Sequence, residues 1–113
     1  MLGNHNHVGS STEVCSFLLT LEEIIQEKLG SPTTNSYVSQ LSSQGTARIA
    51  QKVGEEAVET IIEAVKANFD ESQFLAEAAD LLFHYLILLH QKGYSLKQVV
   101  QVLETRHQIA ENK

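Results

Sequence analysis

The chain has 113 residues, which is enough for one compact domain and too few for two. Fourteen Asp and Glu against eight Lys and Arg give a formal net charge of -6, which argues against a nucleic-acid binder because such proteins neutralise phosphates with clustered cations. An anionic small substrate is compatible with this charge only if a divalent cation reverses the local field. The one cysteine, Cys15, excludes an intramolecular disulfide and a multi-cysteine zinc site, so we expect a cytoplasmic protein.

The first segment, residues 1–16, is expected to be a disordered leader or linker, which leaves 17–113 as the domain. The segment is rich in Asn, His, Gly and Ser and lacks the charged start and apolar stretch of a signal peptide. The longest apolar run, 81–89, is interrupted by His84 and is far shorter than the roughly 18 residues of a membrane span. We therefore expect no membrane association.

In the domain segment, Gly and Pro residues fall near the ends of the predicted segments, as is typical of a helical protein. Gly54 is the exception. Capping residues predict where the helices begin: Thr20 (in a capping box with Glu23), Ser36, Thr46, Asp70 and Ser95. The predicted helices cover about 17–29, 36–45, 46–68, 70–93 and 95 onward. No stretch alternates with period two, so the fold class is all-α, a small bundle of four to five helices.

The predicted helix over 46–68 is amphipathic. Its apolar face repeats every four residues, and its other face carries Arg48, Lys52, Glu55, Glu56, Glu59 and Glu63. Like charges three and four residues apart each cost a few tenths of a kcal/mol, on the order of 0.2–0.5. A face selected for stability alone would interleave more Lys. A solvated polar face and a functional acidic face both stay open.

The next helix is more apolar, because thirteen of the seventeen residues in 74–90 are hydrophobic. It is expected to be buried nearly all round. Glu77, Asp80 and His84 form one stripe on it, and a buried carboxylate needs a charge partner or a metal. Cation partners are available in Arg48, Lys52 and Lys66. However, eight acids lie between positions 55 and 80 and Lys66 is the one cation among them, which favours a metal.

Packing these two helices together would place four carboxylates around one point, those of Glu56, Glu59, Glu77 and Asp80. Hard oxygen ligands without cysteine favour Mg²⁺, with Mn²⁺ as a second option. Because Mg²⁺ recruits phosphate oxygens, an acidic protein could bind a polyphosphate through it. The residues thus predict a magnesium-dependent phosphoanhydride hydrolase.

The spacing of these acids resembles the ExxE…ExxD signature of the all-α MazG-like pyrophosphohydrolases of nucleoside triphosphates. Four segments make the resemblance more specific, namely 36–37 (SY), 45–56 (GTARIAQKVGEE), 77–84 (EAADLLFH) and 103–107 (LETRH). Together they resemble the phosphoribosyl-ATP pyrophosphohydrolase family of histidine biosynthesis, over about residues 17–108. The resemblance implies hydrolysis of phosphoribosyl-ATP to phosphoribosyl-AMP and pyrophosphate.

The resemblance also implies residue roles. Glu56, Glu59, Glu77 and Asp80 would be metal ligands, with Glu55 a further ligand or the group that orients water. Arg48 and Lys52 would meet substrate oxygens or serve as ordinary surface cations. Tyr37 would stack on or hydrogen-bond the substrate, or only pack.

Two residues stay ambiguous between function and packing. His84 is a candidate general base or a satisfied core histidine. Gly54 costs roughly 1 kcal/mol in a helix, which suggests close approach by a neighbouring helix or by substrate.

The sequence also leads to expectations about the oligomeric state, a fused domain and alternative functions. The helix over 74–90 needs more cover than its neighbours give, so we expect a homodimer, as the resemblance also implies. Some members of the family are fused to a phosphoribosyl-AMP cyclohydrolase, so the chain would be a stand-alone enzyme or one domain of a bifunctional protein. The rival functions are a MazG-like pyrophosphohydrolase of ordinary or damaged nucleoside triphosphates and a non-enzymatic helical interaction module.

Overall fold

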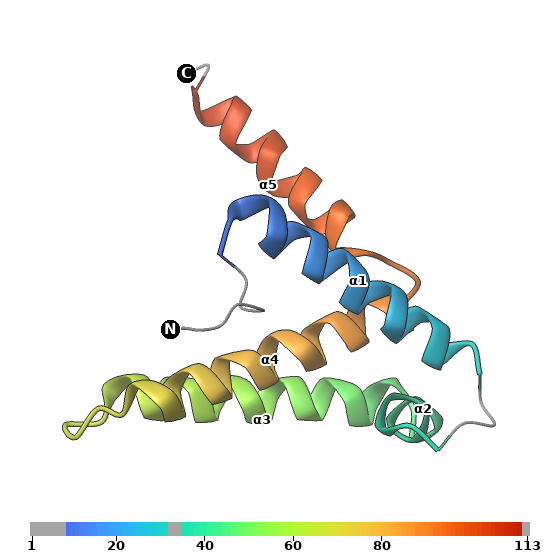
Figure 1. Ribbon diagram of the computed structural model, residues 1–113, viewed down its shortest axis with the longest axis horizontal. Coiled ribbons are helices and arrows are strands. Elements are labelled where there is room, and N and C mark those ends of the chain that lie inside the picture. Colours follow the sequence, from blue (N-terminus) through green and yellow to red (C-terminus); the bar gives the residue numbers. More distant parts are fainter. Residues whose placement is uncertain (1–8, 32–34, 112–113) are drawn as a thin grey trace.

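The computed structural model describes residues 9–31 and 35–111, and every regular element in that part of the chain is a helix, which confirms the all-α prediction. The helices are α1 (Ser11–Leu29), α2 (Tyr37–Ser43), α3 (Thr46–Val65), α4 (Glu71–Gln91) and α5 (Leu96–Glu111). Figure 1 shows α3 and α4 side by side and antiparallel, with α2 at the end where α3 begins and α4 ends. The first helix, α1, crosses this end of α4, and α5 projects away from the pair.

The first helix starts earlier than predicted. Ser10 caps it, accepting a 3.1 Å hydrogen bond from the Glu13 N–H, while the Ser10 N–H donates to the Glu13 carboxylate. The second candidate cap, Thr20, lies in the middle of the helix, where its hydroxyl donates to the Ser16 carbonyl. Both positions fit a capping box, and the helix runs through the second one. Residues 11–16 of the expected leader are therefore helical, and 1–8 lie outside the described residues.

The other boundaries follow the capping signals more closely. Asp70 caps α4, and its Oδ1 accepts the N–H groups of Ser72 and Gln73. Gly45, not Thr46, is the N-cap of α3, with a φ of 96° that favours glycine. The same helix ends at Val65, three residues before the predicted end.

The hydrophobic core lies at the end where α1, α2, the start of α3 and the end of α4 meet. It consists of Ile25, Val38, Leu41, Ile49, Leu86 and Ile87. At the opposite end of the α3–α4 pair, large apolar side chains are exposed, among them Val65, Phe69 and Leu75. The core thus fixes one end of the pair and leaves the acidic segments of α3 and α4 near the middle.

The expectation that α4 is buried nearly all round is wrong for this chain alone. Leu75 and Leu82 of α4 are 55% and 41% exposed, because α1 and α3 cover only part of the helix. Length and composition alone would let α4 cross a membrane. Core helices of soluble proteins pass the same test, and α4 packs along α3 through the stripe that carries Glu77 and His84.

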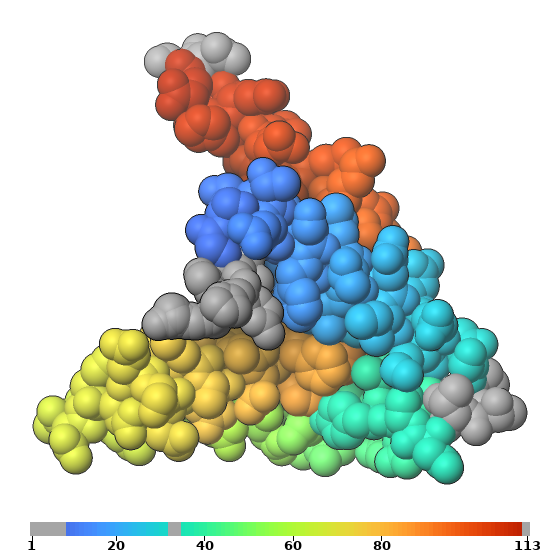
Figure 2. All heavy atoms as spheres, in the orientation of Figure 1, coloured from blue at the N-terminus to red at the C-terminus, as the bar shows by residue number. Residues whose placement is uncertain are grey.

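The last helix, α5, has no buried residue, and Figure 2 shows it extending beyond the body of the molecule. The radius of gyration, 16.5 Å, exceeds the roughly 13 Å of a compact domain of this length. An isolated helix of about this length is only marginally stable in water. The chain therefore leaves both α5 and one side of α4 without cover.

Candidate metal centre

The antiparallel packing of α3 on α4 brings three of the four predicted metal ligands together. One carboxylate oxygen each from Glu56, Glu59 and Glu77 lies within 4.8 Å of the others. The fourth, Asp80, follows Glu77 by almost one turn of α4 and is outside this group, although its charge acts on both Glu56 and Glu77. The spacing of the acids along the two helices thus produces a convergent set of hard oxygen atoms.

The buried carboxylate in this group is not one of those expected from the sequence. Glu77 is half-buried and Asp80 is exposed, whereas Glu56 of α3 is only 6% exposed. The reason is that α4 is covered on one side only, while Glu56 points from α3 toward α4. Its Oε2 atom is buried and has no hydrogen-bond partner. A buried orphan oxygen beside two more carboxylates is the donor set that a divalent cation would satisfy.

The proximity of the acids raises two pKa values. Burial is the main cause for Glu56, followed by a hydrogen bond with the Glu59 carboxyl, which forms only when one of the two groups is protonated, and by the negative charges of Glu59 and Asp80, while Lys52 lowers the pKa. Burial also comes first in raising the pKa of Glu77, followed by the charges of Glu59, Glu56 and Asp80. Without a cation, Glu56 and Glu77 therefore retain their protons to higher pH than free carboxyl groups do.

Two cationic side chains, Arg48 and Lys52, precede the clustered acids on α3. Lys52 Nζ lies 3.7 Å from Oε1 of both Glu55 and Glu56. Arg48 is one turn earlier and is half-buried. The ion-pair interpretation of Lys52 is thus realised in the structure, and it still leaves the ammonium group beside the cluster, within reach of a ligand bound there.

Glu55 lies outside the cluster. Its side chain is exposed, pairs with Lys52 and accepts a 3.1 Å hydrogen bond from Gln51 Nε2. A water bound among the clustered carboxylates would have Glu59 as a nearer neighbour than Glu55. Orienting such a water from Glu55 would require its side chain to leave these partners.

Glu63 of α3 is a further buried acid that the sequence does not reveal as buried. Glu63 is 8% exposed; its Oε2 accepts a 2.8 Å hydrogen bond from Lys66 Nζ and its Oε1 has no partner. It was assigned to the polar face of α3, yet it is four residues after Glu59 and seven after Glu56. That spacing, which places it on the buried stripe, is the signal that could have found it.

Gly54 does not approach another helix within this chain. A Cβ atom added there would meet nothing within 4 Å. The glycine borders a hollow of about 510 Å³ that is lined by Gln51, Gly54, Glu55, Val58 and Glu59. The space next to Glu59 is therefore open to a substrate or to another subunit.

Tyr37 and His84 form a contact between α2 and α4. The Tyr37 hydroxyl lies 2.6 Å from His84 Nε2, and the Tyr37 ring stacks on Phe83 with centroids 6.3 Å apart. On its other side, His84 Nδ1 lies 2.8 Å from the Asp80 carbonyl oxygen. Both ring nitrogens of His84 are thus engaged, which favours a satisfied buried histidine over a free general base.

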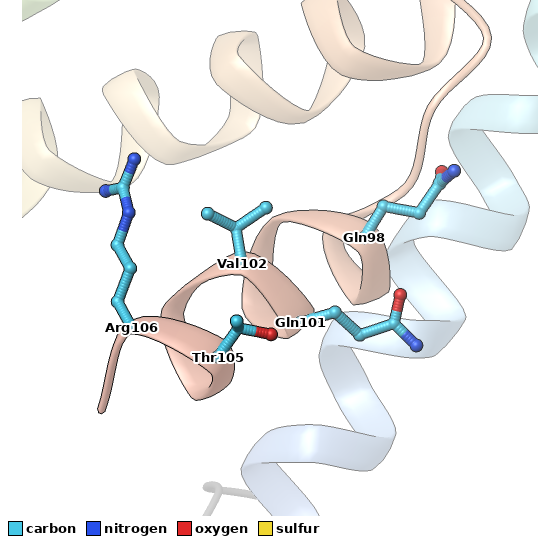
Figure 3. A pocket seen from close by; sticks show the side chains of 5 residues that line it. All are labelled: Gln98, Gln101, Val102, Thr105 and Arg106. Carbon is cyan, nitrogen blue, oxygen red and sulfur yellow. The ribbon is translucent and has the colours of Figure 1, made fainter. Parts of the chain in front are cut away.

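A second hollow of about 510 Å³ lies along α5, away from the acids. Its lining side chains, Gln98, Gln101, Val102, Thr105 and Arg106, all come from this one helix, as Figure 3 shows. Figure 3 also shows Arg106 extended away from the two glutamines rather than converging with them. This surface lacks the converging charged groups of the cluster.

Comparison with known proteins agrees with the acidic signature. The family model described as phosphoribosyl-ATP pyrophosphohydrolase matches residues 18–107. The chain is 43% identical to the histidine biosynthesis bifunctional protein HisIE of Buchnera aphidicola (subsp. Acyrthosiphon pisum) over 95% of this chain and 49% of the relative. The corresponding protein of Escherichia coli is 39% identical over 94% of this chain and 51% of its own length. The chain thus spans about half the length of the curated relatives it matches.

Proposed function

The chain belongs to the phosphoribosyl-ATP pyrophosphohydrolase family, and from this premise we propose that it hydrolyses phosphoribosyl-ATP to phosphoribosyl-AMP and pyrophosphate, the second step of histidine biosynthesis. The observation that carries the proposal is the convergence of Glu56, Glu59 and Glu77, with a buried orphan oxygen on Glu56. An isolated acidic cluster with no cationic partner for that oxygen is poorly suited to a structural role. We place the reaction in the cytoplasm, as for other steps of amino-acid biosynthesis.

The carboxylates would hold Mg²⁺, or Mn²⁺ in its place, through Glu56, Glu59 and Glu77, with Asp80 beside them. The donor set fits these ions because it consists of oxygen atoms alone. A bound cation of this kind lowers the pKa of a coordinated water and offsets negative charge on phosphate oxygens. Because burial and the neighbouring charges raise the pKa of Glu56 and of Glu77, protons compete with a cation at these carboxylates and metal affinity should fall as the pH is lowered.

We assign substrate binding and proton transfer to side chains of this chain. Lys52 and Arg48 would bind phosphate oxygens at the end of the cluster nearer the start of α3, and Tyr37 would contact the rest of the nucleotide. Water would attack the α-phosphorus and lose a proton to a neighbouring carboxylate, Glu59 or Glu55. The bond between the α-phosphorus and the bridging oxygen would break, and pyrophosphate would leave with the bonding electrons.

A homodimer would cover the surfaces that one chain leaves exposed. The exposed apolar side chains of α3 and α4 include Val58, Ile61, Ile62, Val65, Leu75 and Leu82. Exposed apolar side chains in this number favour an interaction site over a solvated surface. The relatives are named bifunctional and this chain matches about half of each, which supports a phosphoribosyl-AMP cyclohydrolase as a fused or separate neighbour.

The proposed reaction is tested by turnover of phosphoribosyl-ATP with Mg²⁺ and with EDTA, in water enriched in ¹⁸O. Release of pyrophosphate, its loss in EDTA, and label in phosphoribosyl-AMP would support the proposal. Label in pyrophosphate would place the attack on the other phosphorus. Faster release from ordinary nucleoside triphosphates would select the MazG-like rival, and no release from any of them would favour the interaction module.

A further inference from the structure

The contacts of His84 determine which of its ring nitrogens carries the proton. A backbone carbonyl can only accept a hydrogen bond, so the 2.8 Å contact with the Asp80 oxygen requires an N–H at Nδ1. In the neutral ring Nε2 is then an acceptor, and the 2.6 Å contact requires the Tyr37 hydroxyl to donate. With the ring neutral, the hydrogen of Tyr37 is committed to His84, and the Tyr37 oxygen keeps only lone pairs for any further partner.

From this geometry we propose that His84 is a positioning residue that makes the Tyr37 hydroxyl a hydrogen-bond acceptor toward the nucleotide. Tyr37 would then receive an O–H or N–H group, that is, a ribose hydroxyl or an exocyclic amine. A phosphate oxygen, which is itself an acceptor, would be rejected there. The inference rests on the proposed function and assigns a part of the substrate to this residue.

The placement of the pair supports contact with the same ligand as the acids. His84 follows Asp80 by one turn on α4, and the antiparallel packing puts this end of α4 beside the segment of α3 that carries Lys52. Tyr37 is 48% exposed, so a ligand can reach it, whereas His84 is 6% exposed and cannot make a third contact. Lys52 and Tyr37 thus lie at the same end of the cluster. Lys52 is suited to bind a phosphate group, and Tyr37 is suited to accept a hydrogen bond from a donor group of the same ligand.

The hydroxyl is also held in place from several directions. The ring stacks on Phe83 at an interplanar angle of 24° and meets the His84 ring edge-on. The start of α2 is fixed by Ser36, whose Oγ accepts a 3.0 Å hydrogen bond from the Ser39 N–H. A hydroxyl oriented in advance loses less entropy when a ligand binds, so the contact can discriminate between donor and acceptor groups.

The test is a steady-state comparison of Tyr37→Phe, His84→Asn and His84→Gln with the wild-type enzyme. Gln can still accept from Tyr37 at the position of Nε2, whereas Asn can replace only Nδ1. We expect KM for phosphoribosyl-ATP to rise about three- to ten-fold in Tyr37→Phe and in His84→Asn, the loss of one neutral hydrogen bond, with kcat within two-fold. Combining the two changes should raise KM no further, and His84→Gln should recover most of the loss.

Two measurements do not depend on turnover. The ¹⁵N shifts of the His84 ring should report a protonated Nδ1 and an unprotonated Nε2, and Tyr37→Phe should move only the Nε2 signal. Mn²⁺ affinity should be unchanged in Tyr37→Phe. A proton on Nε2 would overturn the proposal, as would additive losses of kcat in the double variant. Failure of the wild-type enzyme to hydrolyse phosphoribosyl-ATP would instead refute the proposed function.

The donor group is identified with competing nucleotides. ATP carries both candidate groups, 2′-deoxy-ATP lacks a ribose hydroxyl, and inosine triphosphate lacks the exocyclic amine. A weaker inhibition constant for one of the two analogues, which disappears in Tyr37→Phe, would support the proposal and name the group. Equal inhibition by all three in the wild-type enzyme would exclude the 2′-hydroxyl and the exocyclic amine as the donor and overturn the proposal for these two groups.

Discussion

Replacing Glu56 by Gln is expected to stabilise the metal-free protein while removing its affinity for metal. Glu56 is buried, one of its oxygens has no partner, and its charge is repelled by Glu59 and Asp80. Burying a charged group without a full set of partners costs more than the about 1–3 kcal/mol of a neutral polar group, and Gln removes the charge while keeping the shape of the side chain. Because Lys52 offsets part of this cost at 3.7 Å, we expect Glu56→Gln to gain about 1 kcal/mol, which for a domain of this size raises Tm by about 4 °C.

The pH dependence follows from the raised pKa of Glu56. Below its ordinary value of 4.5 the carboxyl is neutral in both the folded and the unfolded chain, so the substitution removes no charge there. As the pH rises from 4.5 through the raised folded pKa, the unfolded state releases its proton first, and the wild-type protein loses stability. The advantage of Glu56→Gln should therefore be smallest at pH 4 and larger at pH 7.5.

The assay is thermal unfolding followed by circular dichroism in EDTA at both pH values, repeated with Mn²⁺. Added Mn²⁺ should raise Tm of the wild-type protein and leave Glu56→Gln unchanged, which reverses their order. Glu104→Gln, the same change at an exposed site on α5, is the matched control and should match the wild type in every condition. A lower Tm for Glu56→Gln in EDTA at pH 7.5 would refute the reasoning about its charge. Equal stabilisation of both proteins by Mn²⁺ would refute its role as a ligand.

Three further outcomes are expected. Lys52→Met should raise KM for phosphoribosyl-ATP by at least ten-fold, because it removes a cation at the cluster; an unchanged KM would leave Lys52 as an ion-pair partner only. Leu82→Lys should give monomers in sedimentation equilibrium at micromolar concentration where the wild type is dimeric, and persistence of the dimer would place the interface elsewhere. Glu22→Ala should destabilise the fold by about 2 kcal/mol and speed amide exchange at Leu96, since the Glu22 carboxylate accepts from both His90 Nε2 and the Leu96 N–H; unaltered exchange would contradict this.

The contact between Glu22 and His90 is one that the sequence could not predict. Glu22 and His90 are 68 residues apart and lie on helices whose patterns give no sign of a buried hydrogen bond between them. Their 2.7 Å contact exists because α1 crosses the end of α4, and the crossing is decided by packing around Ile25, Leu86 and Ile87. The Tyr37–His84 contact depends in the same way on where α2 docks.

The sequence by itself determined the helical class, most helix boundaries and the segments that hold the acids, because capping and 3.6-residue periodicity are local properties. It predicted that Glu56, Glu59, Glu77 and Asp80 would meet where the two helices pack, and the structure brings the first three together. It misjudged which acids are buried: burial depends on what covers each face, and α4 is covered on one side only. Tertiary structure alone decided that Glu56 and Glu63 are enclosed, that Asp80 is exposed, and that α5 has no buried residue.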